Sequence, residues 1–375
     1  MRKMFILYNS FYDRDGKEFR IGGIQTYIRN LLLVAEEAQY TPVIVQFGSK
    51  FFHRKFNGTV DVYGIDVSRE RTLRRKVKAL LKFVKDEYSQ NDVILFATDS
   101  LYTPTSYDKV IAIQHGIYWD VPSNSSRTKL FEIIFKAIKG FLRINRLRGL
   151  QHLVCVDNNY INWLRTQSSF INMKLYYIPN SVYCGEETDV NDMSAHSGGD
   201  KPIRIVFARR FERYRGTRLF ANAIEDLLKK HENIEVTFAG SGPDEEYLKE
   251  RFIGFHRVKF TTYSSEKSID FHRGFDIVVV PSLGSEGTSY SLLEAMVAGC
   301  AVVATNVGGM TNIVLDNYNG LLIAPEEQEL YAALSKLIDD DSLRNKLSNN
   351  AYTSVNQAFS MELWIQKWKK VLEEV

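Results

Sequence analysis

Two glutamates, Glu286 and Glu294, have seven residues between them and are surrounded by residue types that suit ligand binding. Glu286 lies in a loop rich in Gly and Ser that follows an apolar run, and Glu294 falls in the first turns of an expected amphipathic helix. Open α/β sheets bind ligands beyond the carboxyl ends of their strands, and a helix that begins there directs free N–H groups at an anion. The small residues Gly287, Thr288 and Ser289 would let a phosphate approach the backbone, so this segment predicts a ligand site.

A second candidate is a basic loop that follows another apolar run. It contains five arginines within ten residues: Arg209, Arg210, Arg213, Arg215 and Arg218. A guanidinium group matches phosphate oxygens with paired hydrogen bonds, so the loop predicts a diphosphate clamp. Gly216 is expected to end the loop and admit a helix.

Two further candidates lie in the first half of the chain. His115 follows an apolar run and precedes a glycine, where an imidazole can donate a hydrogen bond or transfer a proton. Gly22 and Gly23 precede a helical pattern over residues 24–33 and resemble a loop that a ligand approaches. The sequence contains no G-x-G-x-x-G fingerprint, Walker A loop, zinc-ligand spacing or G-x-S-x-G elbow.

Each candidate also has a structural interpretation that the residues alone leave open. Glu294 could form a capping box with Ser291, and Glu286 could be a solvated acid. The arginines could form a solvated basic loop. A lone histidine such as His115 is more often structural than catalytic.

The composition is typical of a soluble globular protein of more than one domain. Of 375 residues, 45% are apolar and 25% are charged, and no apolar run is long enough to span a bilayer. The apolar start fits a first strand better than a signal peptide. The three cysteines, Cys155, Cys184 and Cys300, lack disulfide or metal spacing. We therefore expect a reduced, cytoplasmic protein.

Charge is distributed unevenly along the chain. Residues 1–180 contain 27 Lys and Arg against 16 Asp and Glu, whereas residues 181–375 contain 21 against 29. Two segments, residues 69–85 and 127–148, contain many more basic than acidic residues, and the second also has the pattern of an amphipathic helix. Such helices either pack on a core with a solvated basic face or bind an anionic membrane surface. The basic runs lack the interleaved aromatics of a nucleic-acid site, so no nucleic-acid partner is expected.

Apolar runs alternate with helical patterns throughout, which predicts βαβ units with mostly parallel sheets. The expected strands are residues 4–8, 42–47, 93–97, 110–114, 203–208, 234–239, 258–262, 277–280 and 301–305. Residues 183–201 are polar and without periodicity, as in an interdomain linker. The fold class is therefore α/β, with two doubly wound Rossmann-like domains.

Taken in order, these segments resemble the retaining nucleotide-sugar glycosyltransferases of family four, which have the GT-B fold of two domains facing across a cleft. The E-x7-E signature of that family matches Glu286 and Glu294. The segments G-R-L-x-x-x-K-G, G-x-G-P and I-P-N-G-V match residues 208–216, 240–243 and 178–182. The version here is most similar to enzymes of bacterial surface-polysaccharide assembly, such as lipopolysaccharide or capsule biosynthesis.

Three positions depart from the family pattern. Arg215 stands where lysine is usual, which keeps the charge but changes its reach. Asn312 stands where glutamate is common, and Tyr183 replaces the usual acid after the I-P-N-G-V segment.

The resemblance implies a domain plan. Residues 1–182 would form the acceptor-side domain, 183–201 the linker, and 202–360 the nucleotide-sugar-binding domain. Residues 361–375 would form a helix that crosses back to the first domain, although ordinary core packing explains their apolar stripe equally well.

The resemblance also implies roles for single residues. Arg210 and Arg215 would neutralise the donor diphosphate, Glu294 would bind the ribose, and Glu286 would face the donor sugar. His115 would contact that sugar from the other domain. The backbone at Gly287, Thr288 and Ser289 would bind sugar hydroxyls and phosphate, and Gly22 and Gly23 would line the phosphate or acceptor side.

A metal-independent hexosyltransferase is thus expected, with a nucleoside-diphosphate sugar as co-substrate and no other cofactor. Its acceptor would be a glycan or a lipid-linked glycan at the inner face of the cytoplasmic membrane. A sugar phosphorylase, a nucleotide-sugar epimerase and, more remotely, a basic nucleic-acid-binding protein are the alternatives.

Overall fold

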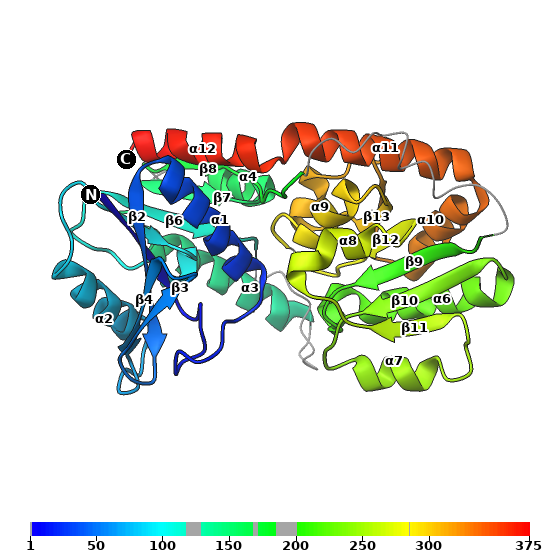
Figure 1. Ribbon diagram of the computed structural model, residues 1–375, viewed down its shortest axis with the longest axis horizontal. Coiled ribbons are helices and arrows are strands. Elements are labelled where there is room, and N and C mark those ends of the chain that lie inside the picture. The colour runs from blue at the N-terminus through cyan, green and yellow to red at the C-terminus, as the bar shows by residue number, and fades with distance from the viewer. Residues whose placement is uncertain (1, 118–128, 168–171, 185–200, 285) are drawn as a thin grey trace. The chain divides into compact units, whose positions relative to one another are not determined.

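The computed structural model describes residues 2–117, 129–167, 172–184, 201–284 and 286–375. The chain divides into two compact units, which are described separately here and whose elements are labelled in Figure 1. Unit 1 comprises Met1–His115, Ser126–Ile178 and Trp364–Val375, and unit 2 comprises Gly116–Ser125 and Pro179–Leu363. Most of the predicted linker, residues 183–201, lies outside the described residues.

Unit 1 is built on an eight-stranded sheet in the order β3-β4-β2-β1-β5-β6-β7-β8. The strands are β1 (Arg2–Tyr8), β2 (Tyr40–Gly48), β3 (Phe52–Phe56), β4 (Val60–Asp66), β5 (Val93–Phe96), β6 (Val110–Gln114), β7 (His152–Cys155) and β8 (Lys174–Tyr177). All neighbours pair in parallel except β3 with β4. The helices are α1 (Gly23–Glu37), α2 (Leu73–Lys85), α3 (Lys129–Arg146), α4 (Asn158–Gln167) and most of α12 (Met361–Glu373).

Unit 2 is built on a six-stranded parallel sheet in the order β11-β10-β9-β12-β13-β14. The strands are β9 (Ile203–Ala208), β10 (Ile234–Ala239), β11 (Val258–Thr261), β12 (Ile277–Val280), β13 (Ala301–Thr305) and β14 (Leu321–Ile323). The helices are α6 (Thr217–Lys230), α7 (Glu245–Arg251), α8 (Ser268–His272), α9 (Tyr290–Val297), α10 (Glu327–Asp339) and α11 (Asp341–Ala358).

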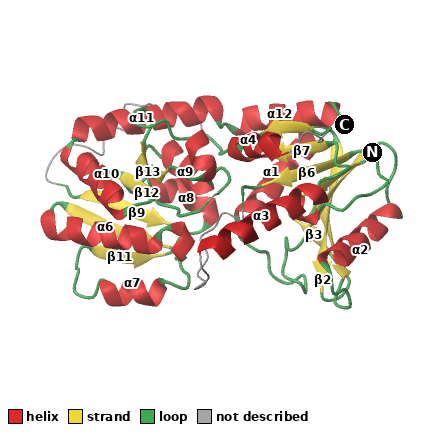
Figure 2. Cartoon of the chain, turned by 180° about the vertical axis from the view of Figure 1, so that it is seen from behind, coloured by secondary structure: helices red, strands yellow, loops and turns green. Residues whose placement is uncertain are grey.

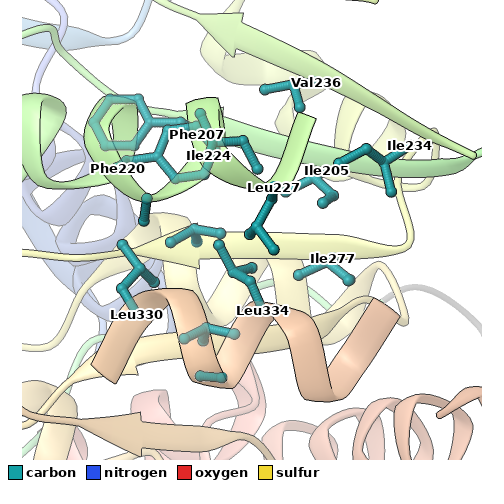
Figure 3. Close-up of a cluster of buried hydrophobic side chains, with 14 of the residues drawn as sticks. Ile205, Phe207, Phe220, Ile224, Leu227, Ile234, Val236, Ile277, Leu330 and Leu334 are labelled. Atoms are coloured by element: carbon teal, nitrogen blue, oxygen red, sulfur yellow. The ribbon is translucent and has the colours of Figure 1, made fainter. Parts of the chain in front are cut away.

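The strands of unit 2 are buried on both faces because alternate side chains enter two different cores. Ile205 and Phe207 of β9 pack with α6 and α10 in the core drawn in Figure 3. Val206 and Ala208, the residues between and after them, pack with α9 on the opposite face. Such a two-sided arrangement requires near-continuous apolar strands, which explains why the sequence showed runs and not alternation.

The predicted fold class is confirmed, since both sheets are Rossmann-like and covered by helices on their faces. Every strand predicted from the sequence is present, with bounds that differ by up to two residues at either end. Strands β4, β7, β8 and β14 were not among the expected strands, and neither was the antiparallel strand β3. Its only buried side chains, Phe52 and Phe56, flank three exposed residues, so it carries no apolar run.

The C-terminal helix α12 packs on unit 1 through two tryptophans. Trp364 and Trp368 are 2% and 0% exposed, and the Trp368 indole donates a hydrogen bond of 3.1 Å to the Tyr27 hydroxyl on α1. The Tyr27 and Trp364 rings meet edge to face at 5.2 Å. In both views α12 lies beside α4 (Figures 1 and 2).

Strand order reverses once in each sheet. In unit 2 the chain runs from β9 outward to β10 and β11, then returns to the other side of β9 to form β12, β13 and β14. In unit 1 it runs from β1 outward to β2 and β4, and then returns beside β1 to form β5. Connections leave such a switch point in opposite directions and open a crevice at the carboxyl ends of the two central strands.

A glycine without a Cβ is required beside the unit 2 switch point. Gly216 has φ +80° and ends the short 3-10 helix η4 (Arg213–Arg215) at the start of α6, as predicted. A Cβ at Gly216 would lie 1.7 Å from the carbonyl oxygen of Pro281, the residue after β12. The absence of a side chain therefore lets the arginine loop lie directly against the end of β12.

We predict that Gly216→Ala lowers the free energy of unfolding of unit 2 by more than ~3 kcal/mol, because a backbone clash adds to the unfavourable φ. Gly254→Ala is the matched control, since Gly254 has φ +86° but no heavy atom within 4 Å of its Cβ position. That control should cost only ~1–2 kcal/mol. Denaturant unfolding of both variants measures the difference, and equal losses would show that the close approach to Pro281 is unimportant.

Candidate active site

The residues at the unit 2 switch point form a buried ionic cluster. Arg209 directly follows β9, and Ser282 and Glu286 lie in the loop after β12. Arg209 Nη2 lies 2.8 and 2.7 Å from the two carboxylate oxygens of Glu286, and its Nη1 donates to Ser282 Oγ at 2.5 Å. Arg215 Nη1 of η4 lies 2.5 Å from Glu286 Oε2, and Ser282 Oγ also donates to Glu286. One carboxylate therefore joins three segments of unit 2.

Burial and charge act in opposite directions on this cluster. Burial alone would raise the pKa of Glu286, but the positive charges and hydrogen bonds of Arg209 and Arg215 outweigh it and lower the pKa to about 2. Burial lowers the pKa of the Arg209 guanidinium, an effect opposed by the charge of Glu286. Glu286 is therefore ionised at neutral pH, and its charge compensates two cations.

The two glutamates of the E-x7-E pair, Glu286 and Glu294, occupy different environments. Glu294 lies on α9, where Ser268 Oγ donates a hydrogen bond of 2.7 Å to Glu294 Oε2. Burial raises the pKa of Glu294, and the Ser268 bond offsets it only partly. The capping box with Ser291 is not formed, since Ser291 Oγ donates to the Ala208 carbonyl and Ser289 is the N-cap. Because their environments shift the two carboxyl pKa values in opposite directions, Glu286 and Glu294 are suited to different roles in a site.

The loop between the glutamates is fixed by its neighbours on both sides. The Asn180 side chain donates a hydrogen bond of 2.6 Å to the Thr288 carbonyl, and the Gly309 N–H donates one of 2.7 Å to the Glu286 carbonyl. A Cβ at Gly309 would lie 2.6 Å from the carbonyl carbon of Gly287. The positions of Thr288 and of Ser289, which begins α9, are therefore set by the backbone.

His115 ends the first segment of unit 1, directly after β6. Its Nε2 lies 2.8 Å from the Ala97 carbonyl oxygen, to which it must donate, and its ring meets Tyr27 edge to face at 4.9 Å. Burial lowers the pKa of His115, so the ring is neutral at pH 7 and its Nδ1 retains a lone pair.

Gly22 and Gly23 stand at the start of α1 in unit 1. Gly22 is the N-cap residue, with an extended backbone and no side-chain cap. The first turn of α1 contains no acidic residue, so its free N–H groups keep the positive end of the helix dipole.

The structure therefore brings Arg215, Glu286, Gly287, Thr288, Ser289 and Glu294 to one edge of the unit 2 sheet. Arg210 is not part of the buried ionic cluster: its side chain is 70% exposed and lies 2.8 Å from Glu212. From the sequence, Arg209 was only one of five arginines and Asn180 only a part of the I-P-N-G-V match, and neither Ser268 nor Ser282 was identified. Arg209 could have been chosen because it is the first residue beyond the strand, and Asn180 because it lies in the matched I-P-N-G-V segment, whereas Ser268 and Ser282 carry no sequence signal. Among the described residues, no group of three or more His, Cys, Asp or Glu could hold a metal ion.

Comparisons with known proteins agree with this geometry. The family model described as "Glycosyl transferases group 1" matches residues 191–354. An uncharacterized glycosyltransferase of Methanocaldococcus jannaschii, MJ1069, is 26% identical over 71% of this chain and 68% of its own length. A phosphatidyl-myo-inositol mannosyltransferase of Mycolicibacterium smegmatis is 27% identical over 48% of this chain and 47% of its own.

Two solved structures share the fold over the whole chain. Sucrose-phosphate synthase from Thermosynechococcus elongatus covers 100% of this chain and 99% of its own, with a TM-score of 0.77 at 16% identity. The Anabaena protein HepE, crystallised with UDP-glucose, covers 100% of both chains with a TM-score of 0.68 at 17% identity.

The two Rossmann-like sheets and the switch-point cluster thus define a GT-B glycosyltransferase. Residues 191–354, which include most of unit 2, match the group 1 glycosyltransferases, and the relatives reported above are glycosyltransferases.

We predict that Glu286→Gln lowers the free energy of unfolding of unit 2 by ~3 kcal/mol at pH 7, because it leaves Arg209 buried without its counter-charge. The folded pKa lies below the ordinary value of 4.5, so the carboxylate stabilises the fold above pH 4.5, and this stabilisation is lost as the pH falls towards about 2. The difference in the free energy of unfolding between parent and variant should therefore become smaller as the pH falls below 4.5. Calorimetric unfolding from pH 7 to 3 measures it.

Glu245→Gln is the control, since Glu245 forms an exposed pair with Lys249 on α7, and its substitution should leave the free energy of unfolding nearly unchanged. A Glu286→Gln variant that is as stable as this control would contradict the ionic cluster.

Proposed function

We propose that this chain transfers a hexose, with retention, from a nucleoside-diphosphate sugar to a hydroxyl of a glycan or lipid-linked acceptor at the cytoplasmic face of the membrane. The observation that carries the proposal is the pair of arginines around Glu286 at a strand-order reversal, beside the N-terminus of α9. The donor is proposed to be a UDP-sugar, by analogy with HepE, whose structure contains UDP-glucose.

The diphosphate is proposed to interact with Arg215 and Arg210. Arg215 is 30% exposed at its side chain, and one of its nitrogens pairs with Glu286, so other N–H groups of its guanidinium are available to phosphate oxygens. Arg210 pairs with Glu212 at an exposed position, where exchanging one anion for another costs little. Arg209, held by Glu286 and Ser282, would position Glu286.

The rest of the donor is proposed to lie over α9. Glu294 would bind the ribose hydroxyls, since its carboxyl oxygens accept hydrogen bonds, as one already does from Ser268. The ionised Glu286 would face the sugar and stabilise positive charge that develops at its anomeric carbon. The backbone of Gly287, Thr288 and Ser289 would bind sugar hydroxyls and phosphate.

His115, Gly22 and Gly23 are proposed to complete the site from unit 1. The neutral imidazole of His115 would contact the donor sugar through Nδ1, the nitrogen that does not bind Ala97. Gly22 and Gly23 would line the phosphate or acceptor side at the uncapped start of α1. With arginines and helix N-termini to stabilise the leaving diphosphate, no metal is required by the proposal.

A membrane-bound acceptor is supported by helix α3, which lies in front of the unit 1 strands in Figure 2. Seven large apolar side chains of α3 are 46–66% exposed: Phe131, Ile133, Ile134, Phe135, Ile138, Phe141 and Leu142. Such a face beside lysines and arginines suits insertion into an anionic interface. Arg143 is excluded from that basic surface, because it forms a buried two-point ion pair with Asp99. Among the described residues, no helix combines the length and hydropathy that spanning a bilayer requires.

The proposal predicts separable effects of two substitutions on donor kinetics. Glu294→Ala should weaken the affinity for UDP about tenfold or more, because it removes a hydrogen-bonding partner of the ribose. His115→Ala should lower kcat by about a hundredfold with a smaller change in donor affinity. UDP titration calorimetry and release of UDP from UDP-hexoses, with a glycolipid acceptor present, measure these quantities.

Glu246→Ala, at an exposed position of α7, is the control for both variants. Equal UDP affinity for the parent and the Glu294→Ala variant would contradict the proposal that Glu294 binds the ribose. With inorganic phosphate added, release of sugar 1-phosphate from the glycolipid with no free UDP would favour the phosphorylase alternative. Inversion of one sugar stereocentre within an intact donor would favour the epimerase.

A further inference from the structure

Two adjoining cavities open at the carboxyl edge of the unit 1 sheet, outside the site described above. One, of about 310 Å³, is lined by residues that include Arg74, Ser100, Asn145 and Arg146. The other, of about 270 Å³, is lined by residues that include Asn9, Arg14, Lys76 and Ser100. They share Leu73 and Ser100, so together they form one basic pocket, whose total size is that of a small-molecule site.

The basic pocket lies at the topological switch point of unit 1. Asn9 directly follows β1, and Ser100 lies in the short 3-10 helix η1 (Asp99–Leu101) after β5. β1 and β5 are the neighbouring strands from which the chain departs in opposite directions. This is the crevice in which open α/β sheets bind ligands, and it is the unit 1 counterpart of the arginine cluster in unit 2.

Within the part of the chain that the structure describes, the charges of the basic pocket are not compensated. Among the residues that the structure describes, no carboxylate lines either cavity, and none of Arg14, Arg74 and Lys76 has an ion-pair partner. The nearest acid in sequence to Ser100 is Asp99, and it is fully engaged by Arg143. Arg146 donates one hydrogen bond, of 2.9 Å, to the Ser100 carbonyl and keeps its other N–H groups.

Helix α2 adds to this positive field. Its N-cap is Thr72, whose hydroxyl accepts from the Arg75 N–H at 3.3 Å, and its first turn contains no acidic residue. Arginines at positions 74 and 75 are unfavourable at the positive end of a helix dipole unless an anion lies there. An anionic ligand in the basic pocket would resolve this conflict.

An apolar surface leads into the basic pocket along α3. Ile138, Leu142 and Arg146 are spaced by four residues and therefore share one face of the helix. Ile138 and Leu142 are 52% and 60% exposed, whereas Arg146 lines the pocket at the end of the same stripe. A cationic pocket that ends an exposed apolar stripe is complementary to an amphiphile with an anionic head.

We propose that the basic pocket binds the phosphate of a lipid-linked acceptor, with the hydrocarbon chain of that lipid lying on the α3 stripe. The inference deepens the proposed function, on which it rests, because it specifies the acceptor as a phosphate-bearing lipid and names its binding residues. Arg74, Lys76 and Arg146 bind the phosphate oxygens, and Arg14 adds a further positive charge to the pocket. Ile138 and Leu142 contact the chain.

The test uses the full chain with two soluble probes, dioctanoyl phosphatidate and glycerol 1-phosphate, and calorimetric titration of each. The double variant Arg74→Gln/Arg146→Gln should lose about tenfold or more in affinity for both probes, because two charge-assisted contacts are removed. Lys78→Gln/Lys82→Gln, which removes two exposed cations of α2 outside the pocket, is the matched control and should bind both probes as the parent does. Ile138→Ser/Leu142→Ser should weaken only the binding of dioctanoyl phosphatidate.

Three results would overturn the proposal. The first is equal loss in the pocket and control variants, which would indicate non-specific attraction to the basic half. The second is equal affinity of the parent for both probes, which would indicate a site for free phosphate compounds. The third is no detectable phosphatidate binding. UDP titration of the same samples keeps this test separate from the proposed function, since UDP binding reports on unit 2 and should be unchanged in every variant.

Discussion

The buried carboxylate of Glu286 is the constraint on which the organisation of unit 2 depends. A charge that is almost removed from water must be compensated. Arg209 and Arg215 compensate the charge of Glu286 from two different segments. Their positions require the loop after β9, the turn η4 and the loop after β12 to converge at one point. Gly216 permits this convergence because a side chain there would collide with Pro281. Electrostatic and steric requirements therefore select the same arrangement.

The same topological logic operates in both units. Each parallel sheet reverses its strand order once, and each reversal gathers arginines at the carboxyl ends of the central strands. In unit 2 the arginines are partly neutralised by Glu286, whereas those in the basic pocket of unit 1 have no carboxylate partner among the described residues. We infer that the two sites receive different anions: the diphosphate of a donor in unit 2 and the phosphate of an acceptor in unit 1.

The fold could be predicted because apolar runs alternate with helical patterns along the chain. A buried parallel strand is apolar along its whole length, so it can be recognised from a short stretch of sequence. The glutamate pair was also predictable, since both residues follow one strand in sequence. By contrast, Ser268 reaches Glu294 from a different strand connection, and Asn180 reaches Thr288 over more than a hundred positions. Contacts of this kind depend on tertiary packing, and the choice between Arg209 and Arg210 depends on which side chain turns inward.

The central claim is that unit 2 binds a nucleoside-diphosphate sugar through its switch-point arginines. Thermal unfolding with a panel of such donors tests it most directly, because a ligand at ~100 times its Kd adds about 2.7 kcal/mol of stability. The account predicts that at least one donor raises the Tm of the parent, that Arg215→Gln loses most of this increase, and that Arg218→Gln, whose side chain pairs with Asp244, retains it. A folded parent that no donor stabilises, or an Arg215→Gln variant stabilised as fully as the parent, would contradict it.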